Sequence, residues 1–165
     1  MNAIDILCDD HRKVDALFKR FEAAKTSSER EDIVQEIVSL IHMHMTLEEE
    51  FFYPQLKECM RKREIDEAQA RDSSIKIKID QLQRLLSEED GDEYNKKVQE
   101  LKATIDAHTR HEEKEMMPKV ERSGLDLTAL GRQIEHRKSE FTKAGTVPAS
   151  DQVLPRNRAQ PEQVE

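Results

Sequence analysis

The sequence predicts an all-α protein: an up-down-up-down antiparallel four-helix bundle with a short fifth helix and a disordered C-terminal tail. The composition favours helices, because the 165 residues include only 4 Gly and 4% aromatic residues, while Glu, Lys, Arg, Leu and Ile are abundant. Apolar residues also recur at steps of three and four along four long segments with short breaks between them. Short connections favour antiparallel neighbours in a bundle. A coiled coil or a helical adaptor would show a similar pattern.

The first two helices are expected at residues 3–25 and 29–62. The apolar stripe of the first helix consists of Ile4, Leu7, Val14, Phe18 and Phe21. Polar residues at 26–28 interrupt this helix, and Ser28 with Glu31 three residues later predicts a capping box at the start of the second. Pro54 lies inside the second segment, where it predicts a kink or a relieved hydrogen bond.

The remaining helices are expected at residues 64–88, 93–122 and 126–143. An acidic turn at residues 89–92 separates the third helix from the fourth, and Gly124 is expected to end the fourth as a left-handed cap. Residues 144–165 are rich in proline and show little apolar periodicity, which predicts a disordered tail. The expected organisation is therefore one bundle domain, residues 1–143, followed by a tail, residues 144–165.

Charge and hydropathy argue against several classes of function. The net charge of -8 disfavours nucleic acid or an anionic membrane as a partner. No apolar run approaches the ~20 residues that a membrane-spanning helix needs. The N-terminal segment is acidic and polar, so no signal peptide is expected and a cytoplasmic location is the default. Cys8 and Cys59 lie inside helical patterns, where they are expected as small buried residues rather than as a disulfide.

Ionisable residues interrupt the apolar stripes near their centres. The four stripes together carry six such residues, namely His11, His44, Glu48, Asp72, His108 and Glu112. An unpaired charge in a core costs several kcal/mol, so buried charges pair with one another or bind metal. A metal-free polar network is one explanation, but a network that is only partly satisfied destabilises the fold. A metal cluster would satisfy all six groups together.

The spacing of these residues supports a metal site. Residues four apart project from nearly the same side of a helix, so His44 with Glu48, and His108 with Glu112, each present an imidazole and a carboxylate to one point. A proline follows each histidine by ten residues, at Pro54 and Pro118. This repetition indicates a helical hairpin used twice, in which each hairpin supplies half of the site.

Two such halves suit two metal ions bridged by Glu48 and Glu112. Mixed imidazole and carboxylate ligands favour iron, with manganese as the alternative, and disfavour structural zinc. Two divalent ions carry four positive charges, which three carboxylates and one hydroxide bridge would balance. An apolar lining from Phe18, Phe52, Ile75 and Ile105 is expected around the site.

The chain resembles the hemerythrin-like, HHE cation-binding family from about Ile4 to Phe141. The resemblance rests on three strings: ILCDDHRKVDALFKRFE, HMHMTLEEEFFYPQL and HTRHEEKEMMPKVERSGLDLTALGRQ. It implies a four-helix bundle with a non-haem di-iron centre and an oxo or hydroxo bridge, which binds dioxygen or responds to oxygen, nitric oxide or iron supply. The chain departs from the family at Asp72, where the family segment carries histidine. A carboxylate there is expected to favour the ferric state.

Three functions remain open at this point. The first is a metal-binding protein that binds or senses dioxygen or another small diatomic molecule. The second is a redox enzyme, such as a ferroxidase or a peroxide-consuming enzyme, or a donor of iron for the repair of iron centres. The HxxxE spacing counts against the ferritin type, which uses ExxH. The third is a metal-free interaction bundle. Three further histidines are expected to lie outside the site: His42, His111 and His136.

Overall fold

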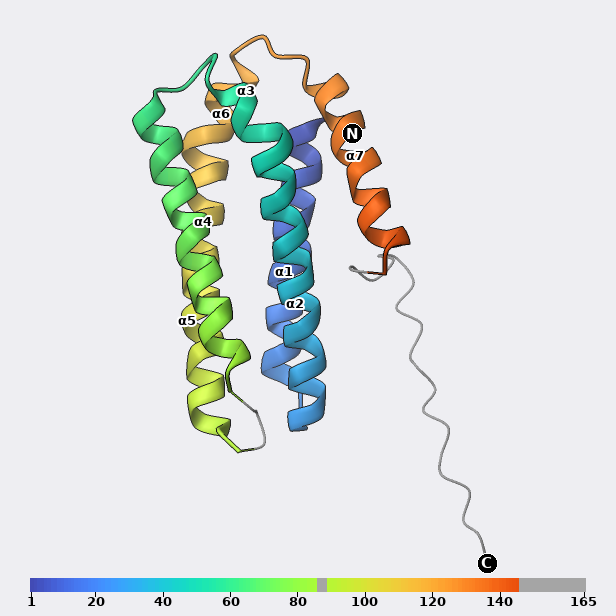
Figure 1. The fold of residues 1–165 in the computed structure, drawn as a ribbon, viewed down its shortest axis with the longest axis vertical. Coiled ribbons are helices and arrows are strands. Elements are labelled where there is room, and N and C mark those ends of the chain that lie inside the picture. Colours follow the sequence, from blue (N-terminus) through green and yellow to red (C-terminus); the bar gives the residue numbers. More distant parts are fainter. Residues whose placement is uncertain (86–88, 146–165) are drawn as a thin grey trace, which may run out of the picture.

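The structure of the protein is a computed structural model that describes residues 1–85 and 89–145. Within these residues the regular structure is all helical, and four long helices form an antiparallel up-down-up-down bundle with a fifth helix along its outside (Figure 1). These helices are α1 (Ala3–Ala23), α2 (Ser27–Leu47), α4 (Lys62–Gln83), α5 (Gly91–His111) and α7 (Leu127–Lys143). The predicted fold class is confirmed for this part of the chain. Most of the predicted tail lies outside the described residues.

Two of the long helices continue through a wide helical turn into a short terminal helix. Helix α2 passes through the π-helical turn η1 (Glu48–Phe52) into α3 (Tyr53–Leu56). Helix α5 passes in the same way through η2 (Glu112–Met116) into α6 (Met117–Glu121). Each turn is closed by a hydrogen bond that spans five residues, because the Tyr53 N–H donates to the Glu48 carbonyl and the Met117 N–H to the Glu112 carbonyl.

Proline gives a physical reason for these wide turns. Pro54 and Pro118 each lie in the first turn of the short helix that follows. A proline has no N–H to donate and its ring collides with the carbonyl four residues earlier, so an unbroken α-helix cannot continue through it. Widening the preceding turn relieves this conflict. The kink expected at Pro54 is therefore realised as a π-helical turn, and the same device recurs at Pro118.

Several helix ends differ from the sequence-based expectation. Thr26 caps α2, because its side chain accepts a hydrogen bond from the Glu29 N–H at 3.1 Å, whereas Ser28 was the predicted cap. The second helical run ends at Leu56 rather than at residue 62, and a turn separates it from α4. The left-handed conformation expected at Gly124 is confirmed by its φ of 80°.

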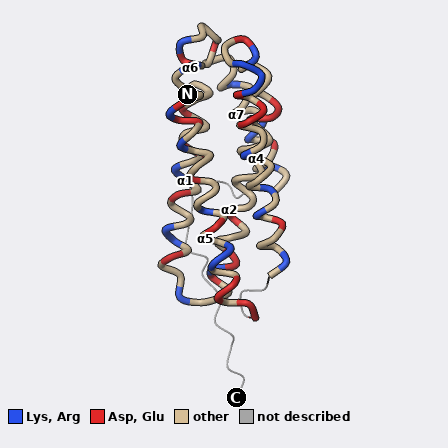
Figure 2. Tube along the Cα trace, turned by 90° about the vertical axis from the view of Figure 1, so that its left-hand side faces the viewer, with Lys and Arg blue, Asp and Glu red and all other residues tan. Residues whose placement is uncertain are grey.

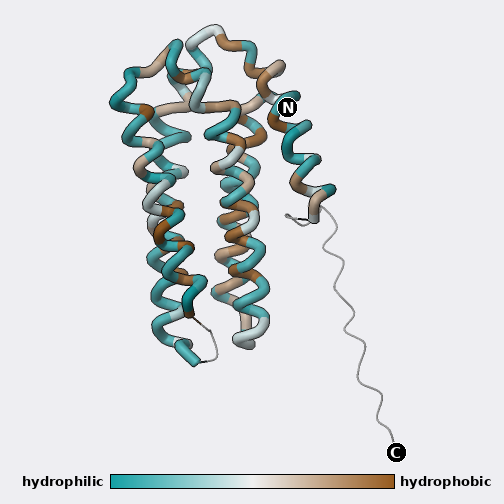
Figure 3. Tube along the Cα trace, in the orientation of Figure 1, coloured by the Kyte–Doolittle hydropathy of each residue, from teal (hydrophilic) through white to brown (hydrophobic). Residues whose placement is uncertain are grey.

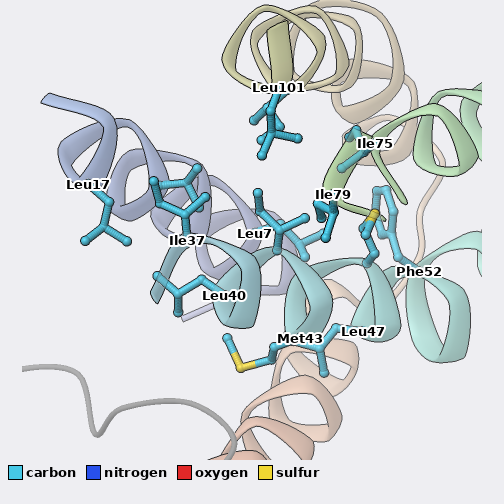
Figure 4. Packing of buried hydrophobic residues seen from close by; sticks show 14 of the residues in the cluster. Leu7, Leu17, Ile37, Leu40, Met43, Leu47, Phe52, Ile75, Ile79 and Leu101 are labelled. Carbon is cyan, nitrogen blue, oxygen red and sulfur yellow. The ribbon is translucent and has the colours of Figure 1, made fainter. Parts of the chain in front are cut away.

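The bundle core consists of aliphatic and aromatic side chains from all the long helices. In Figure 4, Leu7 of α1, Ile79 of α4 and Leu101 of α5 converge on the bundle interior. Hydrophobic positions recur at intervals along each helix, between hydrophilic ones (Figure 3). Fully burying one large aliphatic side chain stabilises the fold by about 1.5–3 kcal/mol. The core therefore fixes the mutual positions of the helices that carry the ionisable residues.

Helix α7 packs against the N-terminal end of α1. Leu130 is 6% exposed and Ile134 is completely buried. Gly131 brings the helix so close to the N-terminus that a Cβ atom there would lie 2.7 Å from the Met1 carbonyl oxygen. The N-terminus accordingly lies beside α7 in Figure 1. This close contact seats α7 against α1.

Charged residues of both signs are distributed along the helices (Figure 2). Many of them form exposed ion pairs within one helix, such as Lys62 with Asp66 at 2.6 Å. Exposed pairs of this kind contribute little stability individually. None of the helices within residues 1–85 and 89–145 combines the length and the apolar character that a bilayer crossing requires.

Candidate metal centre

The structure brings the six predicted site residues together inside the bundle. All six are buried, and the two glutamates are the most enclosed, with Glu48 at 0% and Glu112 at 1% exposure. They come from four helical runs: α1 supplies one histidine, α2 and η1 supply His44 and Glu48, α4 supplies Asp72, and α5 and η2 supply the last pair. Each glutamate is the first residue of a π-helical turn, so the wide turn starts at the site.

The inward nitrogen atoms of the three histidines face the two glutamates. His11 Nε2 lies 3.3 Å from His44 Nε2 and 3.2 Å from Glu112 Oε2. His44 Nε2 lies 3.3 Å from Glu48 Oε1, and His108 Nε2 lies 3.2 Å from Glu112 Oε2. Donor atoms that share an ion at about 2.1 Å and at angles near 90–110° lie roughly 3.0–3.4 Å apart. The spacing of these atoms therefore suits ligands of a shared cation.

The buried oxygen atoms of the glutamates lack hydrogen-bond partners. Both carboxylate oxygens of Glu48 and both of Glu112 are buried without a hydrogen bond, and so is His108 Nε2. Leaving a buried charged group unsatisfied costs several kcal/mol, so such an arrangement needs compensation. A cation between these atoms supplies that compensation, and the mixture of imidazole nitrogen and carboxylate oxygen suits iron or manganese. The residues present thus fit a metal of this type.

Each histidine also faces a carboxylate with its outward nitrogen. His11 Nδ1 lies 2.8 Å from Glu113 Oε1, and His108 Nδ1 lies 3.0 Å from Asp72 Oδ1. His44 Nδ1 lies 3.7 Å from an oxygen of Asp10, which is too long for a hydrogen bond but close enough for a strong charge interaction. A carboxylate at Nδ1 holds the proton on that nitrogen and leaves Nε2 free as a metal ligand.

Asp72 faces the outward nitrogen of His108 rather than the inward nitrogen atoms of the three histidines. One of its oxygens faces His108 Nδ1, and the other accepts a hydrogen bond from the Tyr53 hydroxyl at 2.8 Å. Asp72, Glu48 and His108 nevertheless offer a group of possible ligand atoms within 4.8 Å of one another. The contacts of Asp72 with Tyr53 and with the outward nitrogen favour a role in orienting His108. Direct ligation by Asp72 stays a prediction.

The electrostatics of the centre are those of buried carboxylates and imidazoles that lie close together. Burial raises the pKa of Glu48 to about 8, and repulsion by Glu112 adds to this effect. Burial opposes ionisation of Glu112 as well, but His108 and the other two imidazoles hold its pKa well below its usual range. Burial would lower the pKa of His108, yet Glu112 and Asp72 raise it to about 10.

His44 behaves in the same way as His108. Burial disfavours its charged form, but Glu48 and Asp10 raise its pKa well above the ordinary value. Protons thus neutralise the carboxylates in the metal-free centre. A bound cation would take over that role, so metal binding should release protons.

A small cavity adjoins the three imidazoles. Its volume is about 20 Å³, which is room for one molecule of one or two heavy atoms. Glu48 and Glu112 are not among its lining residues. Its walls are mainly apolar and comprise Asp10, His11, Val14, Ile41, His44, Met45, Ile75, Ile105, His108 and Thr109. Ile75 and Ile105 line it as expected, whereas Phe18 and Phe52 do not.

The remaining histidines lie outside this cluster. His42 is exposed, and the side chain of His136 is 78% exposed. His111 is partly buried, with Nδ1 3.3 Å from Glu115, and it faces none of the six site residues in the contacts of the described residues. The expectation that these three histidines are not part of the site agrees with these positions.

Sequence reasoning missed two carboxylates of the centre, Asp10 and Glu113. Asp10 lies three residues after Leu7 and four before Val14, so it shares the buried face of α1, and this spacing could have revealed it. Glu113 stands next to Glu112 and is 42% exposed, and no pattern in the sequence distinguishes it from a solvated glutamate.

Comparison with known proteins agrees with this fold. The family model described as Hemerythrin HHE cation binding domain matches residues 2–120. Among solved structures, the fold is similar to that of a hemerythrin HHE cation binding domain-containing protein from Mycobacterium kansasii. The TM-score is 0.77 at 24% sequence identity, over 87% of this chain and 89% of that chain. At this identity the likeness shows the fold alone. No curated protein matches the sequence.

Proposed function

The chain belongs to the hemerythrin HHE cation-binding domain family, and from this premise we propose that it is a non-haem di-iron protein that binds or senses a small diatomic molecule, such as dioxygen or nitric oxide. The proposed metal ligands are His11, His44, Glu48, His108 and Glu112. Asp72 is proposed to orient His108 from outside. Manganese is the alternative metal.

One observation carries the proposal. All four carboxylate oxygens of Glu48 and Glu112 are buried without hydrogen-bond partners, beside three imidazole nitrogens. Cations bound between the two carboxylates would satisfy these oxygens. The proposal of two ions rests on the presence of two such carboxylates, each paired with a histidine four residues earlier in the chain.

The protein's own residues prepare the centre for a small ligand. The outer carboxylates hold the three imidazole rings with Nε2 facing inward, and a mainly apolar cavity adjoins the rings. A cavity of about 20 Å³ has room for a molecule of one or two heavy atoms. When bound, iron supplies redox-active coordination positions for such a molecule.

Metal analysis of anaerobically purified protein tests this proposal. We expect about two iron ions per chain. We also expect a chelator to lower the thermal midpoint by roughly 5–10 °C, because a ligand at about 100 times its Kd stabilises by about 2.7 kcal/mol. An optical spectrum taken before and after addition of air or nitric oxide should change in the metal-loaded protein. Repeated turnover of hydrogen peroxide or ferrous iron would instead favour the enzymatic alternative.

The matched variants are Glu48→Gln and Glu49→Gln. Both residues lie in η1, but Glu48 is buried in the centre, whereas Glu49 is exposed and pairs with Lys76 at 2.6 Å. We expect Glu48→Gln to lose most of the bound metal and Glu49→Gln to retain it. A protein that contains no transition metal, and whose thermal midpoint does not respond to chelators, would contradict the proposed function.

A further inference from the structure

Helix α7 reaches the metal centre from outside the four-helix bundle. It runs along the outside of the bundle (Figure 1) and lies beyond residues 2–120, which the family model matches. Its Lys138 nevertheless forms an ion pair with Asp10 of α1, where the Lys138 Nζ donates to Asp10 Oδ1. Asp10 is only 2% exposed, so its charge is neutralised by this lysine rather than by solvent.

The pair of Lys138 and Asp10 continues to a proposed metal ligand. The second oxygen of Asp10, Oδ2, lies 3.7 Å from His44 Nδ1. Both of these atoms are buried and neither makes a hydrogen bond. No water fits between atoms this close, so the carboxylate acts directly on the imidazole. A line of contacts thus runs from Lys138 through Asp10 and His44 to Glu48, whose Oε1 is 3.3 Å from His44 Nε2.

A second contact ties α7 to the wide turn that begins at Glu48. The Arg137 guanidinium donates two hydrogen bonds to the Glu50 carboxylate, at 2.9 and 3.0 Å. Such a two-bond pair fixes geometry more strictly than a single hydrogen bond. Glu50 lies in the middle of η1, two residues after Glu48. Two neighbouring residues of α7 therefore contact the surroundings of the centre. Lys138 contacts the outer partner of His44, and Arg137 contacts the turn that carries Glu48.

The other two histidines of the centre do not depend on α7 in this way. The outer partner of His108 is Asp72 of α4, which Tyr53 supports by a hydrogen bond. The outer partner of His11 is Glu113 of η2, which is 42% exposed and can be solvated. Among these three imidazoles, His44 is the one whose outer carboxylate is charge-paired with α7.

We propose that Lys138 is a positioning residue of the metal centre, and that its charge holds the Asp10 carboxylate next to His44. This inference rests on the proposed metal centre. A buried carboxylate without a cation is unfavourable and turns towards any available solvent. Lys138 keeps Asp10 in place, and Asp10 in turn orients the imidazole and strengthens Nε2 as a donor. Loss of the outer partner of a metal-binding histidine typically weakens metal binding 10–100-fold.

The first test compares metal affinity in Lys138→Met, Lys138→Arg and Lys143→Met. Lys143 is an exposed lysine at the end of the same helix, so its replacement controls for loss of one charge. Binding of Fe(II) and of Mn(II) to the full chain is measured anaerobically by competition with a chelator. We expect about tenfold weaker binding by Lys138→Met, and affinities within about twofold of the parent for the other two variants. Equal affinity of Lys138→Met and the parent would overturn the inference.

A double-mutant cycle with Asp10→Asn separates positioning from general loss of stability. If Lys138 acts through Asp10, its replacement should weaken binding in the parent but have no further effect in the Asp10→Asn background. An equal further loss in that background would refute the proposed route. If Lys138→Met loses helicity, Lys138→Ala, which favours the helix and has no group that can contact Asp10, serves in its place with the same two criteria.

Nitrogen NMR of the metal-free protein gives a readout that does not involve metal. Replacement of Lys138 should change the Nδ1 resonance of His44 and leave that of His108 in place, because Asp72 and Tyr53 support His108 independently. An unchanged His44 resonance would count against the inference. Failure of the proposed function gives a different result, since the parent protein itself would then bind neither ion.

Discussion

The three imidazoles of the centre share one arrangement but differ in how their outer carboxylates are supported. Asp72 is held by the Tyr53 hydroxyl, Asp10 by a lysine, and Glu113 faces solvent. Outer partners set the orientation and donor strength of a metal-binding imidazole. The three histidines are therefore expected to differ in rigidity, and His11 should be the easiest to displace.

The small cavity beside these histidines gives a residue-scale prediction. Ile75 is 1% exposed and lines the cavity, while Ile79, one turn further along α4, does not. Ile75→Phe adds side-chain volume at the cavity, and we expect it to lower nitric oxide affinity of the metal-loaded protein at least tenfold while metal content is retained. Overpacking should cost about 1–3 kcal/mol of stability. The readout is nitric oxide titration followed optically.

Ile79→Phe is the matched control for this experiment. It makes the same chemical change on the same helix but away from the cavity. Its ligand affinity should equal that of the parent. Equal losses in both variants would mean that the cavity does not hold the ligand.

The sequence predicted the inward placement of all six ionisable residues, because helical periodicity alone decides which face of a helix a residue occupies. The periodicity could not show whether a buried carboxylate faces the inward Nε2 atoms of the histidines or an outward Nδ1 atom. Asp72 illustrates this limit, since its burial was predicted but its contacts with Tyr53 and His108 depend on helix rotation and side-chain rotamer. The spacing of Asp10 places it on the buried face of α1, but nothing in the sequence connects it with Lys138, 128 residues later in the chain.

At the scale of helices, the two π-helical turns place the glutamates. Each turn begins at a glutamate four residues after a histidine and precedes a proline. The sequence showed the repeat and predicted an irregularity at Pro54, because proline cannot continue an α-helix undisturbed. It did not reveal the type of irregularity, since a kink and a widened turn both relieve the same conflict. Helix ends such as Leu56 also depended on turn contacts that periodicity does not encode.

The seat of α7 gives a prediction at this scale. In Gly131→Val the new Cβ would lie 2.7 Å from the Met1 carbonyl oxygen and 3.0 Å from the Ala3 nitrogen, so the two segments must separate. We expect a loss of about 1–3 kcal/mol in unfolding free energy, even though replacing glycine ordinarily favours a helix. Denaturant unfolding measures the loss, and hydrogen exchange should show faster exchange in α7.

Thr128→Val is the control for this prediction. Thr128 is exposed on the same helix, and its replacement also yields valine. Its unfolding free energy should stay within about 0.5 kcal/mol of the parent. If Gly131→Val is as stable as this control, close contact with the N-terminus does not seat α7.

At the scale of the whole molecule, metal-free and metal-loaded protein should differ in how their stability depends on pH. The pKa of Glu48 is raised to about 8, chiefly by burial, and that of His108 to about 10 by its carboxylate neighbours against the effect of burial. Both values exceed those of the unfolded chain, so the folded protein binds more protons above neutrality. Each raised group then contributes stability at low pH that is lost as the pH rises through its folded value.

We therefore expect the thermal midpoint of the metal-free protein to decrease as the pH is raised from about 7 to about 9.5. The slope should be on the order of 1 kcal/mol per pH unit. The metal-loaded protein should show a flatter profile, because its ligands are already deprotonated. Calorimetry of both forms across this range is the measurement. A midpoint that rises with pH in the metal-free protein would contradict the assigned pKa directions.

The overall topology was largely readable from the sequence, since four long amphipathic segments with short connections leave few arrangements. The position of α7 was not readable, because its apolar residues could have covered several faces of the bundle. That residues 1–143 form an independent domain stays a prediction.

The close approach of Gly131 to Met1 has a practical consequence for handling the protein. Asn2 caps the start of α1, accepts a hydrogen bond from the Asp5 N–H at 3.0 Å, and lies directly beside this approach. An affinity tag fused ahead of Met1 would emerge where α7 is seated and could push that helix aside. Displacement of α7 would also move Lys138, so the tagged protein would retain iron poorly. This loss would then be attributed wrongly to the untagged protein. Purification tags are better placed after Glu165.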